Sequence, residues 1–288
     1  MSKVLAINKY TGIDTRSAIG TVDHPMANMD RAPTIAELCS VFLKDGVALA
    51  VTACRKALHE AQISPADITH VVSTTCTNSA NPGFDHYVCK GLGITQAVEK
   101  VLLHGIGCSG GLASLRTAAN LALGSSFRGK KARVLVVALE ISSLLVRSEL
   151  DSVAELQQTR IGIMLFSDCA SALVLSNGIG EEAEPVYELL GWDHRVIPDT
   201  EADLGFDVDP LGRSCASFIF RFLLMVKQVG KLSSLLVYQN SQEEQLRQHS
   251  LTSSLPFQTS RHPINPQQTS TGPYILAAQP YFLAWSER

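Results

Sequence analysis

The sequence predicts an α/β protein, and three observations support this class. Apolar runs of strand length alternate with helical patterns of about 10 to 15 residues. The run Ala132–Glu140, "ARVLVVALE", is almost continuously apolar, as in a strand that is covered on both faces. The stretch Val101–Gly124 passes from an apolar run through glycines directly into an alanine- and leucine-rich helical pattern. Together these features predict βαβ units and a mainly parallel sheet.

The elements are expected in a regular order along the chain. Apolar residues between Thr34 and Ile63 recur near helical spacing, which predicts one or two amphipathic helices with a break at Asp45-Gly46. The elements that follow are a strand at Ile68–Thr75, a short helix closed by Gly91 or Gly93, a strand at Val98–Leu103, a helix at Ser109–Leu123, and strands at Ala132–Glu140, at Ser171–Gly178 and in "PVYELLGWDHRVI".

Composition changes near Gly212. The 288 residues suffice for one large or two modest domains. From Arg213 onward the chain is rich in Ser and Gln and shows no sustained strand-helix alternation. Its stretch Tyr238–Pro273 is too polar to offset its ordering entropy by burial, whereas a helix over Ala216–Val229 stays open as an alternative. We therefore expect a folded domain over residues 1–212 and a largely disordered tail over residues 213–288.

Charge and cysteine usage exclude several function classes. The formal charge is -3 and the basic residues are scattered, so neither nucleic acid nor an anionic membrane surface is expected as a partner. No apolar run reaches the roughly 20 residues of a membrane span, and the first residues do not form a signal peptide. Seven cysteines without CxxC or Cys/His spacing indicate neither a disulfide framework nor a metal site. A cytoplasmic protein with a small-molecule or protein partner is expected.

Cys108 occupies the glycine-rich break between strand and helix, in "GIGCSGG". At a helix N-terminus the free N–H groups and the helix dipole favour the thiolate, which is the nucleophilic form of cysteine. A backbone N–H of the same turn could stabilise a developing oxyanion, which suggests acyl transfer through a thioester. Position alone leaves a packing cysteine equally open. A nucleotide-binding loop is disfavoured, because neither the G-x-G-x-x-G nor the G-x-x-x-x-G-K-[ST] pattern is completed.

Several separated blocks resemble one family. The blocks "GIGCSGGLASLRTAANLALG", "ARVLVVALEIS" and "RIGIMLFSDCASALVLSNG" resemble the nucleophile region of the type III polyketide synthases, the chalcone synthase-like branch of the thiolase fold. The blocks "GIDTRS", "STTCTNSANPGFDHYV" and "DLGFDVDPLG" resemble the fungal members. The resemblance runs from about Val4 to Gly212. It implies a thiolase-like fold, essentially its N-terminal βαβαβ half, with a central buried helix after the nucleophile and an irregular tail.

The resemblance also implies a substrate and roles for particular residues. Cys108 would be the acyl-carrying nucleophile, loaded from an acyl-CoA, with malonyl-CoA as the extender and no bound cofactor. Phe166 would be the aromatic gatekeeper between the CoA tunnel and the polyketide cavity, whose wall would include Gly162, Thr75 and Ser142. Asn81 would reach across a homodimer into the partner's cavity.

Two motifs of the resembled family do not occur in this sequence. Its catalytic His and Asn lie in a Leu-His-Pro-Gly-Gly-type and a Gly-Asn-x-Ser-Ser-type block of the second half, and neither block is present. His262 shares only a His-Pro pair with the first block, and His104 is expected to pack on the strand before Cys108. The opening strand and much of the basic CoA-binding stretch are also expected to be missing, with Lys3 and Lys9 as remnants.

Three hypotheses follow for the function. The first is a type III polyketide synthase-like acyltransferase that is impaired in condensation as a truncated chain. The second is a non-catalytic remnant of the thiolase fold that dimerises with a full-length relative. The third, which the blocks around Asn81 and Phe166 disfavour, is a ketoacyl synthase that uses carrier-protein substrates.

Overall fold

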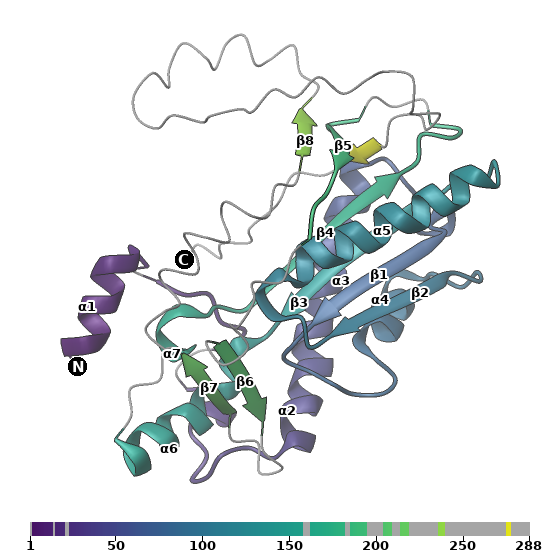
Figure 1. Ribbon diagram of the computed structural model, residues 1–288. Helices are drawn as coiled ribbons and strands as arrows, with labels where there is room; N and C mark the ends of the chain where they lie inside the picture. Colours follow the sequence, from purple (N-terminus) through teal and green to yellow (C-terminus); the bar gives the residue numbers. More distant parts are fainter. Residues whose placement is uncertain are drawn as a thin grey trace.

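The computed structural model describes residues 2–13, 15–20, 23–157, 162–181, 185–194, 204–208, 214–218, 236–239 and 275–277. The main sheet consists of β1 His70–Thr75, β2 Glu99–His104, β3 Arg133–Glu140, β4 Cys169–Ser176, β5 Tyr187–Gly191, β8 Leu236–Gln239 and β9 Ile275–Ala277. Its strand order is β2-β1-β3-β4-β9-β5-β8. The strands β6 Leu204–Val208 and β7 Ser214–Phe218 form a separate antiparallel pair (Figure 1).

The helices are α1 Ser2–Thr11, α2 Ile35–Val41, α3 Val47–Glu60, α4 Phe84–Leu92, α5 Gly110–Phe127, α6 Val146–Leu156 and α7 Gly162–Leu165. The helices α2 to α5 lie close to the predicted positions, and three further helices, α1, α6 and α7, were not predicted. Thr34 and Glu37 form a capping box that starts α2, because each side chain accepts the backbone N–H of the other. The predicted break between α2 and α3 is a π-helical turn, Phe42–Gly46. Gly93, with φ +73°, ends α4 in the left-handed conformation that glycine adopts without strain.

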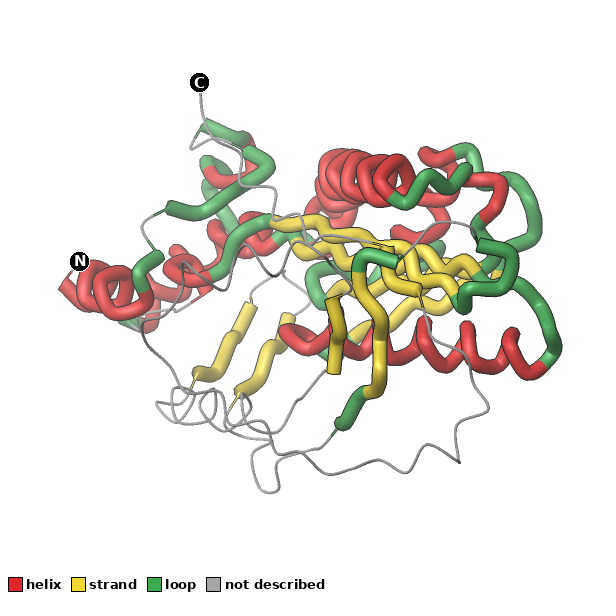
Figure 2. Tube along the Cα trace, turned by 90° about the horizontal axis from the view of Figure 1, so that it is seen from above, coloured by secondary structure: helices red, strands yellow, loops and turns green. Residues whose placement is uncertain are grey.

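Helices cover both faces of the sheet, which therefore separates two apolar cores (Figure 2). Alternate residues of β3 point to opposite faces, as the period of a strand requires. Leu135 and Val137 belong to the core that α2, α3 and α4 complete. Val134 and Val136 belong to the core on the α5 side. This arrangement explains why β3 reads as a continuous apolar run, and it confirms the α/β class.

The prediction of a mainly parallel sheet is wrong beyond β3. Strands β2 and β3 pair with β1 in parallel, whereas β4 pairs with β3 antiparallel, from Arg133↔Ser176 to Glu140↔Cys169. The next pairs, β4 with β9 and β5 with β9 and β8, are antiparallel too. The reason lies in the connection after β3. Residues 141–168 start and finish at the carboxyl end of β3, so β4 runs back along it.

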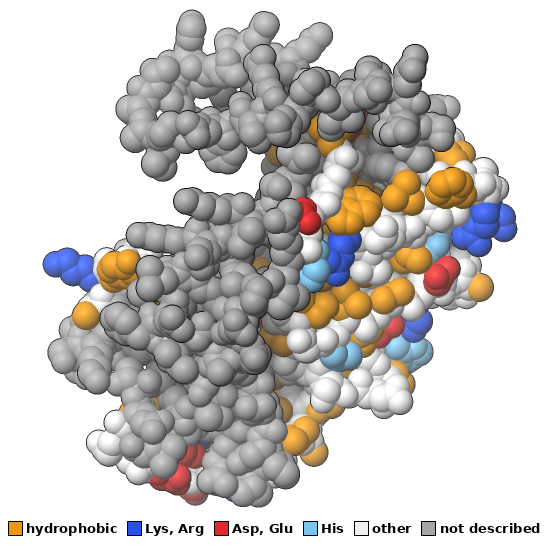
Figure 3. Space-filling model, in the orientation of Figure 1, with side chains coloured by type: hydrophobic (Ala, Val, Ile, Leu, Met, Phe, Trp, Pro, Cys, Tyr) orange, Lys and Arg blue, Asp and Glu red, His pale blue; other side chains and the backbone are white. Residues whose placement is uncertain are grey.

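Helix α5 is buried on one side only. Its face toward β1 and β3 includes Leu115, Ala118, Ala119 and Ala122, all nearly or fully buried. On its other side the Leu112 and Phe127 side chains are 47% and 83% exposed. Figure 3 shows hydrophobic side chains scattered over the described part of the face on which α5 lies. The expected central helix is therefore present, but the described part of the chain does not enclose it.

The expected boundary near residue 212 stays a prediction. Residues 209–213, between β6 and β7, lie outside the described residues. Of the tail expected over residues 213–288, the structure describes only β7, β8 and β9. Among the described residues, no helix has both the length and the apolar character needed to cross a membrane.

Candidate active site

Cys108 lies in a 3₁₀ turn, Gly107–Ser109, directly before α5. Gly105 and Gly107 on either side of Ile106 have φ values of +69° and +67°, which a side chain would strain, so the glycines of this turn are required by the backbone. The Cys108 side chain is exposed. The side chain of the N-cap residue Ser109 accepts no hydrogen bond from the first turn of α5, and this turn contains no acidic residue. No carboxylate of the first turn therefore competes for its backbone N–H groups. The predicted placement of the thiol at a helix N-terminus is confirmed.

A partly buried carboxylate joins the ends of β1 and β3 beside this turn. Glu140, the last residue of β3, accepts the backbone N–H of Cys76 at 2.9 Å on Oε1 and that of Thr77 at 3.2 Å on Oε2. The hydroxyls of Thr75 and Thr77 donate to Glu140 Oε2 at 3.3 and 2.9 Å. The Cys76 thiol donates to the same oxygen at 3.4 Å. The segment after β1 is therefore fixed to the end of β3 by one side chain.

The surroundings of this cluster raise the pKa of two of its groups, Glu140 and Cys76. Burial, opposed by the hydrogen bonds from Cys76 and Thr77, raises the pKa of the Glu140 carboxyl. Burial, then the Glu140 charge, raises the pKa of the Cys76 thiol to about 12, and the charge of Cys108 is close enough to add to this shift. Cys76 is therefore a protonated hydrogen-bond donor at neutral pH.

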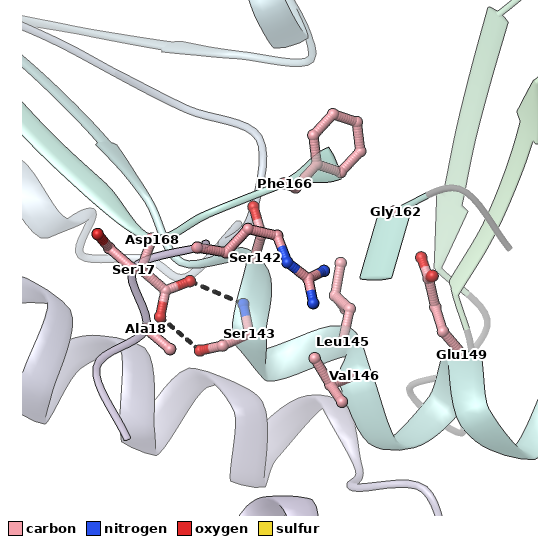
Figure 4. Close-up of a pocket in the computed structure, with 11 residues that line it drawn as sticks. Ser17, Ala18, Ser142, Ser143, Leu145, Val146, Glu149, Gly162, Phe166 and Asp168 are labelled. Atoms are coloured by element: carbon pink, nitrogen blue, oxygen red, sulfur yellow. Dashed lines mark hydrogen bonds between the residues drawn. The ribbon is translucent and has the colours of Figure 1, made fainter. Parts of the chain in front are cut away.

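A small pocket of about 130 Å³ lies two residues further along the chain from Glu140 (Figure 4). Its wall combines Ser142, Ser143, Leu145 and Val146 after β3 with Glu149 of α6. The remaining lining residues come from two other segments and are Arg16, Ser17, Ala18, Gly162, Phe166 and Asp168. In Figure 4 Phe166 and Gly162 lie along one side of this space, with Ser142 and Leu145 facing them.

The structure brings some of the expected site residues together and keeps others apart. Phe166, Gly162 and Ser142 line this pocket. Thr75 is 1% exposed and belongs to the Glu140 cluster, and neither Thr75 nor Cys108 is among the described lining residues. Asn81 is exposed, in a loop before α4 where the Asn81-Pro82 peptide is cis. The roles expected for these residues stay predictions.

The histidines do not supply a base within the described site. His104 is exposed at the end of β2, and His70 is buried beside Thr69, whose hydroxyl lies 2.7 Å from its Nδ1. His262, which shares a His-Pro pair with the family block, lies outside the described residues. Nor do the described residues contain a cluster of three or more His, Cys, Asp or Glu side chains that could hold a metal ion.

Two functional candidates were missed by sequence reasoning. Glu140 is the acidic residue that ends the apolar run of β3, and that contrast is a signal that could have identified it. Asp168 stands two residues after Phe166 in "LFSD", and its buried carboxylate contacts two other segments of the chain. No pattern in the sequence shows that contact, because its partners, the backbone N–H groups of Ile19 and Ser143 and the Ser143 hydroxyl, lie far away along the chain.

The sequence is similar to known polyketide synthases over most of its described part. The family model of the chalcone and stilbene synthases, N-terminal domain, matches residues 8–179. "Type III polyketide synthase pspB" from Penicillium soppii is 43% identical over 215 residues, which cover 73% of this chain and 54% of that protein. "Acylalkylpyrone synthase csyB" from Aspergillus oryzae is 41% identical over 215 residues, 74% of this chain and 54% of that protein. The chain thus spans about half the length of these two relatives.

Solved structures show the same fold. A type III pentaketide synthase from Neurospora crassa superposes with a TM-score of 0.76 at 63% sequence identity, covering 80% of this chain and 61% of that one. CsyB in complex with CoA-SH superposes with a TM-score of 0.75 at 39% identity, covering 79% and 61%. The expected thiolase-like architecture is therefore confirmed.

Proposed function

Because this chain belongs to the chalcone and stilbene synthase family, we propose that it is a type III polyketide synthase-like acyltransferase in which Cys108 accepts an acyl group from an acyl-CoA. The observation that carries this proposal is the position of Cys108, an exposed thiol in the strand-to-helix turn at the start of α5. Its relatives include polyketide synthases, and one structural neighbour was solved with CoA-SH.

The transfer follows from ordinary thioester chemistry. The Cys108 thiolate attacks the carbonyl carbon of the acyl-CoA, and a new carbon–sulfur bond forms as the carbonyl becomes a tetrahedral oxyanion. Backbone N–H groups at the start of α5 are the donors available to that oxyanion. The intermediate then collapses, the bond to the CoA sulfur breaks, and CoA leaves as a thiolate that takes a proton from water. No cofactor takes part in this exchange.

The remaining expected site residues enter the proposal as parts of the substrate path. Phe166 would stand between the CoA side and the acyl cavity, with Gly162 and Ser142 on the wall, a role that their shared pocket supports. Thr75 would line the cavity near Cys108. Asn81, exposed in its loop, would contact a second copy of the chain, so that the active form would be a homodimer.

We further propose that this chain alone performs little decarboxylative extension with malonyl-CoA. The His and Asn blocks with which the family polarises carbonyl groups do not occur in its 288 residues. Incubation with an acyl-CoA and malonyl-CoA, followed by chromatography of the products, tests this. We expect acylated protein without pyrones, and pyrone formation that depends on Cys108 would contradict the proposal.

The exposed side of α5 favours a second candidate function. Leu112 and Phe127 leave apolar surface open on a helix whose other face is buried. A non-catalytic chain that dimerises with a full-length relative would cover this surface. Co-purification of the two proteins, with no acylation of Cys108, would favour this candidate over the first.

A further inference from the structure

Asp168 connects three segments that the chain separates widely. Its carboxylate is buried, with the residue 5% exposed. Oδ1 accepts the backbone N–H of Ser143 at 2.7 Å, and Oδ2 accepts the Ser143 hydroxyl at 2.5 Å (Figure 4). Oδ2 also accepts the backbone N–H of Ile19 at 2.7 Å. The Asp168 backbone N–H donates to Ser17 O at 2.8 Å, so the same residue holds the 17–19 segment from two sides.

Each of these segments contributes to the pocket that Phe166 lines. Ser17 and Ala18 form part of its wall, as do Ser142 and Ser143, and Phe166 lies two residues before Asp168. The Phe166 backbone N–H donates to Gly162 O at 3.0 Å, which holds Phe166 at the end of α7. One buried residue, Asp168, therefore links the three segments that form the walls of this pocket.

We propose that Asp168 is a positioning residue for the acyl-CoA path, a role that rests on the function proposed above. It fixes the positions of Phe166 and Ser142 relative to the 17–19 segment, and these positions determine the affinity of the pocket for the acyl-CoA. It does not act on the thiol, because its described hydrogen-bond partners are Ser17, Ile19 and Ser143. Loss of Asp168 therefore weakens substrate binding and leaves the intrinsic reactivity of Cys108 unchanged.

The Asp168→Asn variant separates these contacts. An amide keeps one oxygen to accept the Ser143 N–H, but its NH₂ group cannot accept the Ile19 N–H, which loses its acceptor. The variant therefore removes the side-chain contact to Ile19, while Ser143 stays bound and the Asp168 backbone N–H still donates to Ser17 O. Asp168→Ala removes all three side-chain bonds and is expected to have the larger effect. Glu181→Gln is the matched control, because Glu181 is also a carboxylate with several hydrogen bonds, to Arg133 and Ser176, at the opposite end of β4.

The experiment measures acylation of Cys108 in the full chain by intact-protein mass spectrometry over a range of acyl-CoA concentrations. Iodoacetamide alkylation of Cys108 serves as a readout that does not use the pocket. For Asp168→Asn we expect the half-saturating acyl-CoA concentration to rise about tenfold, the size expected for one lost bond to a charged acceptor. The limiting acylation rate and the alkylation rate stay within about twofold of the parent, since the thiol is untouched. Glu181→Gln changes none of the three quantities.

Two results would overturn the proposal. One is an unchanged half-saturating concentration in Asp168→Asn, and the other is an equal rise in Glu181→Gln, which would indicate a general loss of stability. If the parent chain is not acylated at all, the proposed function fails and hydrogen exchange decides the inference. Faster exchange of the Ile19 and Phe166 amides in Asp168→Asn, but not in Glu181→Gln, then supports the positioning role, and equal exchange refutes it.

Discussion

Glu140 accepts the backbone N–H of Cys76 on both carboxylate oxygens, at 2.9 Å to Oε1 and 3.1 Å to Oε2. This contact ties the residue after β1 to the last residue of β3, next to the turn that carries Cys108. Because burial raises the pKa of Glu140, the folded protein retains the Glu140 proton to higher pH than the unfolded chain does. The stability that this proton provides is therefore lost as the pH rises through the raised pKa.

A pH series of urea unfolding tests that sign. As the pH rises above the usual pKa range of a carboxyl group, the free energy of unfolding of the parent should fall relative to that of Glu140→Gln, whose side chain does not titrate. Glu37→Gln provides a control of opposite sign, because hydrogen bonds from Arg31 and Thr34 lower the pKa of Glu37 to about 2. The parent should lose stability relative to Glu37→Gln only as the pH falls below the ordinary carboxyl range. A difference between the parent and Glu140→Gln that does not vary with pH would contradict this account of Glu140.

The described cysteines should react with a thiol reagent in a fixed order. Cys108 is exposed, whereas Cys54 and Cys89 are buried and burial raises the pKa of both thiols. Cys76 should also react slowly near neutral pH, because its pKa is raised to about 12 and the thiolate is the reactive form. Timed alkylation followed by peptide mass spectrometry measures the order. Labelling of Cys76 before Cys108 would be inconsistent with the structure.

Two adjacent glycines provide a matched test of the turn at the start of α5. A Cβ on Gly110 would lie 2.6 Å from Thr74 Oγ1, whereas a Cβ on Gly111 would meet nothing within 4 Å. Gly110→Ala should therefore push the start of α5 away from β1 and displace Cys108, slowing its acylation by at least about tenfold. Gly111→Ala should leave the rate near that of the parent. Equal rates in the two variants would show that this packing does not position the thiol.

The core on the α3 side should depend on Phe42. Its side chain is fully buried, and its ring meets the Phe84 ring edge to face at a centroid distance of 6.0 Å. Phe42→Ala should lower the free energy of unfolding by about 3–5 kcal/mol, as expected for a large buried aromatic residue. Phe127→Ala, at a position 83% exposed, should change it by less than about 0.5 kcal/mol. Denaturant unfolding of both variants measures the difference.

Periodicity located most of the helices and strands because it reflects burial directly. The break at Asp45-Gly46 and the end of α4 at Gly93 could be predicted, since glycine chemistry marks both. The direction of β4 could not be predicted in the same way. It depends on where residues 141–168 return to the sheet, and an apolar strand has the same pattern in either direction.

The candidate site was predictable only where local sequence carries the chemistry. The glycines around Cys108 identify a strand-to-helix turn, and the structure places the thiol there. The family resemblance grouped Phe166, Gly162 and Ser142, which share one pocket, together with Thr75, which is not among its described lining residues. Glu140 and Asp168 act through backbone N–H groups of distant segments, at Cys76 and Thr77 and at Ile19 and Ser143. Such contacts arise only when the chain is folded.

The central claim, that Cys108 carries the acyl group, is tested most directly with a radiolabelled acyl-CoA. The full chain and its Cys108→Ala variant are incubated with the label, denatured, and digested for peptide analysis. The account predicts about one label per parent chain, on the peptide that contains Cys108, and none on the variant. An unlabelled parent chain, or equal labelling of the variant, would contradict it.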